Sequence, residues 1–268
     1  MNWLELRLAT PARIGLGRSG TALPTAAQLD FQLAHARARD AVYAALDAER
    51  LLAELRSLGL EALPLHSQAC DRPTYLRRPD LGRRLDPESR QLLSRHSRES
   101  GNPGQPFRRP PLDPRFRGGD DVGDGCDIAF VIADGLSAMT VNAYAVPLIA
   151  AALSRLSGWR IGPVAVVEQG RVAIGDEIGG LIGADLVAVL IGERPGLSAA
   201  DSLGVYLTWQ PAPGAVDAAR NCLSNIRPEG MPVADGAEAL VRLITAARQH
   251  RMTGVTLSQQ LALGADNV

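Results

Sequence analysis

Cysteine, aromatic side chains and net charge are all scarce in this chain of 268 residues. Its three cysteines, Cys70, Cys126 and Cys222, form no C-x-x-C pair, and an odd number does not suggest a disulfide framework, so we expect a reducing compartment. The formal net charge is -1, which argues against a dedicated binder of nucleic acid or of membrane surfaces. Aromatic residues make up 4% of the chain, which favours an α/β architecture over an all-β sandwich.

Long apolar runs are also missing from the sequence. No run approaches the ~20 residues of a membrane span. Glu5 and Arg7 interrupt the apolar residues near the N-terminus, so a secretion signal is not expected either. We therefore expect a cytoplasmic protein.

The sequence motifs of nucleophilic, metal and phosphate chemistry are equally absent. There is no G-x-S-x-G elbow, no Walker loop and no H-E-x-x-H pair. Residues 15–20 match G-x-G-x-x-G by letter, but Pro11 and Pro24 interrupt the strand and the helix that a dinucleotide-binding unit needs. We expect no catalytic set and no metal site in this chain. A nucleotide-dependent α/β oxidoreductase stays an alternative, which a strand before Gly15 would favour.

The strongest structural signal is the apolar run Leu186–Ile191, which leads into the polar loop 192–197. An uninterrupted run of this length predicts a strand buried on both faces, as in a parallel sheet. Other strands are predicted at 128–133, 161–168 and 205–209, with helices at 140–156, 176–182 and 237–248. This alternation predicts an α/β fold with a Rossmann-like, doubly wound, mostly parallel sheet over residues 123–268.

Residues 1–93 are expected to form an N-terminal arm and a helical region outside this sheet. We expect helices capped by Thr25, Asp47 and Asp86, with Gly59 ending the second, and a short strand at 60–65. From Ser94 the composition turns to proline, glycine and arginine with few apolar residues. Residues 94–122 are therefore predicted to be a disordered insertion that interrupts the third helix.

Polar residues at the predicted strand ends are the candidate functional groups. Asp134 and Glu193 each follow a buried strand, at the end where α/β sheets bind ligands. With no partner identified for acid–base chemistry, a binding or structural role is favoured. Another group, Arg77, Arg78, Arg83 and Arg84, brackets a Pro-Asp turn and suits either an interface with carboxylates or phosphates, or a solvated loop.

Five short motifs together carry a resemblance to a known family. They are L-R-R-P-D-L-G-R-R at 76–84, D-G-L-S at 134–137, G-R-V at 170–172, G-E-R-P-G-L at 192–197 and C-L-S-N-I at 222–226. Over nearly the whole chain except the insertion, the sequence resembles the small subunit of ethanolamine ammonia-lyase.

The resemblance implies a function for a two-subunit enzyme. That enzyme splits ethanolamine into acetaldehyde and ammonia by a radical mechanism that uses adenosylcobalamin. The large subunit holds the substrate, while the small subunit contacts the cobalamin and supports assembly into a hexamer of heterodimers. No nucleic acid or membrane is implied. It stays open whether the host encloses the enzyme in a bacterial microcompartment.

The resemblance also implies three cobalamin-binding residues, Val172, Glu193 and Cys222. Val172 would pack on the apolar rim of the corrin, Glu193 would accept hydrogen bonds from the cofactor's amide side chains, and Cys222 would lie close to it. Taken without the motifs, Val172 would be ordinary core packing and Cys222 a buried core thiol. A non-catalytic assembly or regulatory protein that binds its partner through the arginine loop stays a further alternative.

Overall fold

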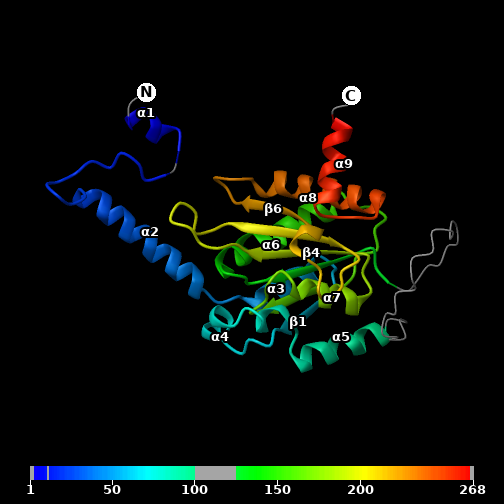
Figure 1. The fold of residues 1–268 in the computed structure, drawn as a ribbon. Coiled ribbons are helices and arrows are strands. Elements are labelled where there is room, and N and C mark those ends of the chain that lie inside the picture. Colours follow the sequence, from blue (N-terminus) through cyan, green and yellow to red (C-terminus); the bar gives the residue numbers. More distant parts are fainter. Residues whose placement is uncertain (1–2, 11, 100–124, 266–268) are drawn as a thin grey trace.

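A six-stranded sheet is the centre of the computed structural model, which describes residues 3–10, 12–99 and 125–265 (Figure 1). The strand order is β1-β3-β2-β4-β5-β6. The first four strands in this order are parallel, and β5 and β6 add an antiparallel edge. The strands are β1 (Ala62–His66), β2 (Ile128–Ala133), β3 (Val164–Glu168), β4 (Leu186–Gly192), β5 (Leu203–Trp209) and β6 (Arg220–Ile226).

Helices cover both faces of the sheet, because successive side chains of a strand point to opposite sides. Ile128, Phe130 and Ile132 of β2 face a core cluster, which they share with α3 (Ala48–Ser57), α6 (Ala138–Leu153) and α8 (Val233–His250). The alternate residues of β2 face a second cluster, which they share with α5 (Pro87–Glu99) and α7 (Ile174–Ile182). The mixed α/β architecture with a mostly parallel sheet is as predicted.

The sheet differs from the prediction at both of its edges. The N-terminal region was expected to lie outside the sheet, and this is wrong for β1, which pairs with β3 from Ala62↔Val164 to His66↔Glu168. Strand β6 was not predicted, because its residues 220–226 are mostly polar and show no regular apolar alternation. β3 begins at Val164, and Ile161 makes only an isolated bridge with Ile128.

The helix ends confirm two of the three predicted N-caps. The Asp47 side chain accepts a hydrogen bond from the Arg50 backbone N–H at 3.2 Å, and the Asp86 side chain accepts one from the Ser89 N–H at 2.7 Å. Thr25 is not an N-cap: it is the first residue of α2 (Thr25–Tyr43), which Pro24 precedes without a capping hydrogen bond. Gly59 follows α3 with φ +78°, as expected of a residue that ends a helix.

The predicted insertion begins inside a helix. α5 continues through Ser94 to Glu99, so the prediction that the helix is interrupted at Ser94 is wrong. The rest of the predicted insertion, 100–122, lies outside the described residues. His96 of α5 forms a 2.5 Å hydrogen bond with Glu61, the residue before β1, and Asp127 immediately precedes β2. The two flanks of the segment thus lie at the amino-terminal edge of the parallel strands.

The remaining helices lie around the periphery. They are α1 (Trp3–Leu8), α4 (Arg72–Arg77) and α9 (Val255–Ala265). In the described part of the chain before Gly15 there is a helix and no strand, so the G-x-G-x-x-G match lacks its required context. Within the described residues no helix combines the length and apolar character needed to cross a membrane, and no three His, Cys, Asp or Glu side chains gather as metal ligands.

Candidate binding site at the carboxyl ends of the strands

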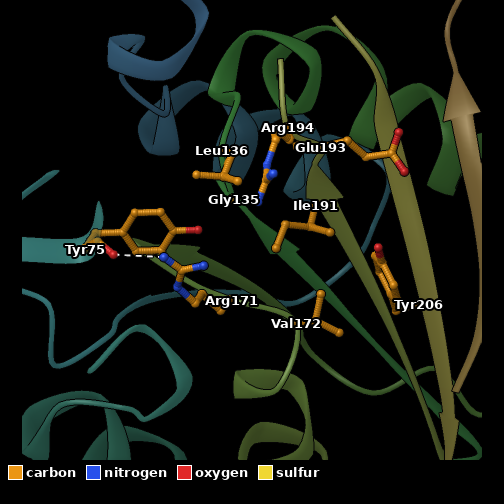
Figure 2. Close-up of a pocket in the computed structure, with 10 residues that line it drawn as sticks. Tyr75, Gly135, Leu136, Arg171, Val172, Ile191, Glu193, Arg194 and Tyr206 are labelled. Atoms are coloured by element: carbon orange, nitrogen blue, oxygen red, sulfur yellow. Dashed lines mark hydrogen bonds between the residues drawn. The ribbon is translucent and has the colours of Figure 1, made fainter. Parts of the chain in front are cut away.

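A cavity of about 460 Å³ lies where the chain crosses from one side of β2 to the other. β2 is followed by β3 on one side, and β3 by β4 on the other, and such crossing points are where open α/β sheets bind ligands. The loops after all three strands line the cavity (Figure 2). They contribute Gly135 and Leu136 after β2, Arg171 and Val172 after β3, and Glu193 and Arg194 after β4.

Two glycines allow the loops after β2 and β4 to pack backbone against backbone. Gly135 has φ +57°, and a Cβ there would lie 2.3 Å from the Gly192 carbonyl oxygen. A Cβ on Gly192 would in turn lie 2.0 Å from the Ser137 carbonyl oxygen. The Leu136 N–H donates to the Gly192 carbonyl at 2.9 Å, which joins the D-G-L-S and G-E-R-P-G-L motifs directly.

Asp134 joins the loops after β2 and β3 from beneath the cavity. Its side chain is 4% exposed, and its carboxylate accepts the Gly170 N–H at 3.0 Å and lies 3.4 Å from the Arg72 guanidinium. Burial raises the pKa of Asp134 to about 6, although Arg72 and the backbone N–H groups of residues 169, 170 and 135 act in the opposite direction. Because this carboxylate is enclosed, the structure gives Asp134 the role of holding the loops rather than of meeting a ligand.

Tyr75 carries two guanidinium groups over its ring. Arg72 lies 4.7 Å and Arg171 4.4 Å from the ring centroid, within the range of cation–π attraction. Arg171 also donates to the Tyr75 carbonyl at 2.9 Å (Figure 2). The Tyr75 hydroxyl donates to the Gly170 carbonyl at 3.3 Å. Burial raises the pKa of Tyr75 to about 12, so its hydroxyl stays a neutral donor.

The arginine loop, for which an interface and a solvated loop were both open, is not among the residues that line the cavity. Arg78 pairs at 2.7 Å with the neighbouring Asp80 in an exposed position, which is the solvated arrangement. Instead Tyr75, near the start of that loop, lines the cavity, and the Arg72 guanidinium lies over its ring; neither was predicted as a site residue. An aromatic residue next to an arginine-rich motif was the available signal for Tyr75.

Glu193 is held on one side of its carboxylate only. Oε2 accepts hydrogen bonds from the Ser202 hydroxyl and from the Asn225 N–H, the latter at 3.2 Å. Gly204 leaves room for it, since a Cβ there would lie 2.9 Å from Oε1. Among the described residues no ion pair joins Glu193 to an arginine, and Figure 2 shows its carboxylate pointing away from Arg194. Oε1 therefore keeps its capacity to accept.

The three predicted contact residues do not all reach the cavity in the same way. Val172 and Glu193 line it directly. Cys222 lies in β6 opposite Tyr206 of β5, so the two residues are cross-strand neighbours. Tyr206, which was not predicted as a site residue, lines the cavity. Cys222 is exposed, so it is not a core thiol.

Comparison with known proteins bears directly on this arrangement. The family model described as ethanolamine ammonia-lyase light chain (EutC) matches residues 1–258. A protein of Pseudomonas syringae pv. tomato named ethanolamine ammonia-lyase small subunit is 49% identical over 263 residues, which are 97% of this chain and 84% of that protein. Small subunits of the same name from Ralstonia nicotianae and Azotobacter vinelandii are 49% identical over 259 and 260 residues, covering 96% of this chain and 88% of each relative.

The chain belongs to the ethanolamine ammonia-lyase light-chain family. The resemblance drawn from the five motifs is thereby confirmed. The light-chain match runs from the arm through the cavity to α9, so it includes every loop that lines the cavity. A light chain, or small subunit, is by its name one part of a larger enzyme, which implies a large subunit as its partner.

Proposed function

We propose that this chain is the cobalamin-contacting small subunit of an adenosylcobalamin-dependent ethanolamine ammonia-lyase, which converts ethanolamine to acetaldehyde and ammonia. The observation that carries the proposal is the meeting of Val172 and Glu193 in one cavity, with Cys222 on the strand next to a third wall residue, Tyr206. The sheet with its covering helices, β1, α3 and α5 included, would form the cobalamin-contacting, Rossmann-like domain. The residues before α3 would be an arm, and residues 100–122 an insertion foreign to the domain.

The residues of the cavity fit one side of such a cofactor. Leu136, Val172 and Ile191 supply apolar surface, while Oε1 of Glu193 can accept an amide N–H and the Tyr206 hydroxyl adds a polar group. Pockets of roughly 300–1,000 Å³ enclose drug-sized ligands. Cobalamin is larger than these, so a cavity of about 460 Å³ would hold one edge of it and leave the rest to the large subunit.

The chain's own residues would position rather than react. When bound, adenosylcobalamin supplies the radical chemistry. Arg171 and Asp134 hold the loop that carries Val172, and Ser202 and Asn225 orient Glu193. Their part in the reaction would be to fix the cofactor against the large subunit and to exclude water from the contact.

Co-expression with the large subunit tests this proposal. We expect the two chains to co-purify in the cytoplasmic fraction as a hexamer of heterodimers, by native mass. We expect turnover of ethanolamine only when both chains and adenosylcobalamin are present. Each chain alone serves as the control. Full turnover by the large subunit without this chain, or failure of the two to associate, would contradict the proposal.

A further inference from the structure

Helix α2 packs against very little of the rest of the chain within the described residues. Of its 19 residues only Ala41, near its C-terminal end, is buried. The side chains of Leu29, Phe31 and Leu33 are 58%, 44% and 51% exposed. Figure 1 shows α2 extending from the body of the molecule towards the N-terminal arm.

The exposed half of α2 is apolar on more than one side. Leu29 and Leu33 are four residues apart and share one face, while Phe31 lies on the opposite face, because each residue turns the helix by about 100°. Between residues 25 and 36 the only acidic or basic side chains are those of Asp30 and His35. Apolar side chains on a helix are stabilised by burial, and packing rather than propensity stabilises most helices. This half of α2 therefore calls for a cover that reaches both faces.

The C-terminal end of α2 and the arm that precedes α2 are both attached to loops that border the cavity. The Arg72 guanidinium donates from Nε to the Val42 carbonyl at the end of α2, and from Nη1 to the Gly135 carbonyl after β2, both at 2.7 Å. Before α2, Arg13 donates to the Leu197 carbonyl in the loop after β4 at 3.4 Å. A molecule that covers α2 is therefore also placed against the mouth of the cavity.

We propose that α2 is the docking element for the ethanolamine ammonia-lyase large subunit, which receives it in an apolar groove and is thereby seated over the cavity. This inference rests on the proposed function. A helix of 19 residues is about 28 Å long and about 10 Å wide, so its wall measures about 900 Å². That is comparable with the roughly 800 Å² which one partner buries in a standard interface.

A second copy of this chain fits α2 less well than the large subunit does. A symmetric pair of α2 helices would cover one face of each helix, and would leave exposed either Phe31 or the pair Leu29 and Leu33. A groove encloses both faces. It also continues onto the cavity, which is where the proposed function places the large subunit.

The test measures binding of this chain to the immobilised large subunit. We expect the variants Leu29→Asp/Leu33→Asp and Phe31→Asp each to raise the dissociation constant by about tenfold or more, because each puts a charge into an apolar groove. The control is Val216→Asp. Val216 is 66% exposed and lies between β5 and β6, at the edge of the sheet opposite to the cavity, and its dissociation constant should stay within about twofold of wild type.

The melting temperature of each isolated variant checks that a loss of binding is not a loss of folding. All four substituted side chains are exposed, so we expect melting close to wild type. Wild-type binding that both α2 variants retain would overturn the docking inference and leave the proposed function intact. If wild type self-associates through α2, and the variants lose self-association but still bind the large subunit, the docking inference is likewise overturned and the proposed function is left intact. Wild type that does not bind the large subunit at all would overturn both.

Discussion

The Glu193 carboxylate has two oxygens in different situations, and this asymmetry gives a prediction. Oε2 is engaged by Ser202 and Asn225, while Oε1 faces no donor among the described residues. In Glu193→Gln the amide oxygen can keep the Oε2 contacts, which puts the NH₂ where a cofactor amide would donate. We expect cobalamin affinity of the assembled enzyme to fall about tenfold, as loss of one such hydrogen bond implies.

The measurement is a spectroscopic cobalamin titration with the native mass recorded on the same sample. Glu238→Gln, an exposed carboxylate in α8, is the matched control. Cobalamin affinity that is unchanged in an intact complex would mean that Glu193 is not a contact. Loss of the complex would mean that it holds the loop.

Asp134 predicts a pH dependence of stability. Its pKa is raised by burial from 3.8 to about 6 in the folded chain, so the folded state binds a proton more tightly than the unfolded state. The free energy of unfolding therefore falls as pH rises from about 4 through 6, by up to about 3 kcal/mol for this group. Asp134→Asn removes this contribution. Urea denaturation at pH 4, 5, 6 and 7 should show the variant gaining on wild type as pH rises; a constant difference would show that Asp134 ionises normally.

At the residue scale the sequence identified groups whose position follows from a strand end. Glu193 comes directly after β4 and Val172 lies in the loop after β3, both within recognisable motifs, so their place at the carboxyl edge could be predicted. The position of Tyr206 in the cavity wall could not be predicted, because it depends on the antiparallel register of β5. Arg72 and Tyr75 are brought in by helix α4, and Arg72 is 62 residues away from Asp134 in the sequence. The local sequence pattern holds no information on such packing.

Elements β6 and α7 are joined by a buried ion pair. Arg220 of β6 donates to both carboxylate oxygens of Asp176 of α7, at 2.6 and 2.7 Å, and the two side chains are 3% and 1% exposed. Arg220 also donates to Thr208 of β5 at 2.9 Å. The pair therefore fixes the antiparallel edge, and with it Cys222 and Tyr206, against the body of the sheet.

Breaking this pair should be costly. Arg220→Ala leaves Asp176 buried without its partner, and we expect it to lower the free energy of unfolding by about 3–5 kcal/mol. Replacing both groups, in Asp176→Leu/Arg220→Met, should cost much less because no charge is stranded. Urea titrations of both variants decide the matter. Equal losses in the two would show that packing, rather than charge pairing, holds this edge.

Burial decides which helices and strands could be predicted from the sequence. The apolar runs of β2 and β4 are buried on both faces, so composition alone identified them. β6 is an edge strand with exposed polar residues, and its pairing is set by β5 rather than by its own sequence. α5 continues beyond Ser94 to Glu99 because the proline-rich composition begins only after Glu99.

At the scale of the whole molecule, we predict that this chain depends on the large subunit for activity. The isolated chain with adenosylcobalamin should not turn over ethanolamine, because the described residues of the cavity are positioning groups and the neighbouring Asp134 carboxylate is enclosed. A coupled assay for acetaldehyde, with the co-expressed complex as the positive control, measures this. Turnover by the purified chain alone would show that the substrate site is here.

The position of the flanks of residues 100–124 has a consequence for how the chain folds. Pairing of Leu65 with Val167 closes a loop that contains this segment. The entropy lost on closing a loop grows only with the logarithm of its length, so 25 more residues in a loop of this size raise the cost by about 0.3 kcal/mol. Because the segment enters and leaves at the edge away from the cavity, the same position is a suitable place to insert an epitope or a fluorescent reporter, which would follow assembly without touching either α2 or the loops around Glu193.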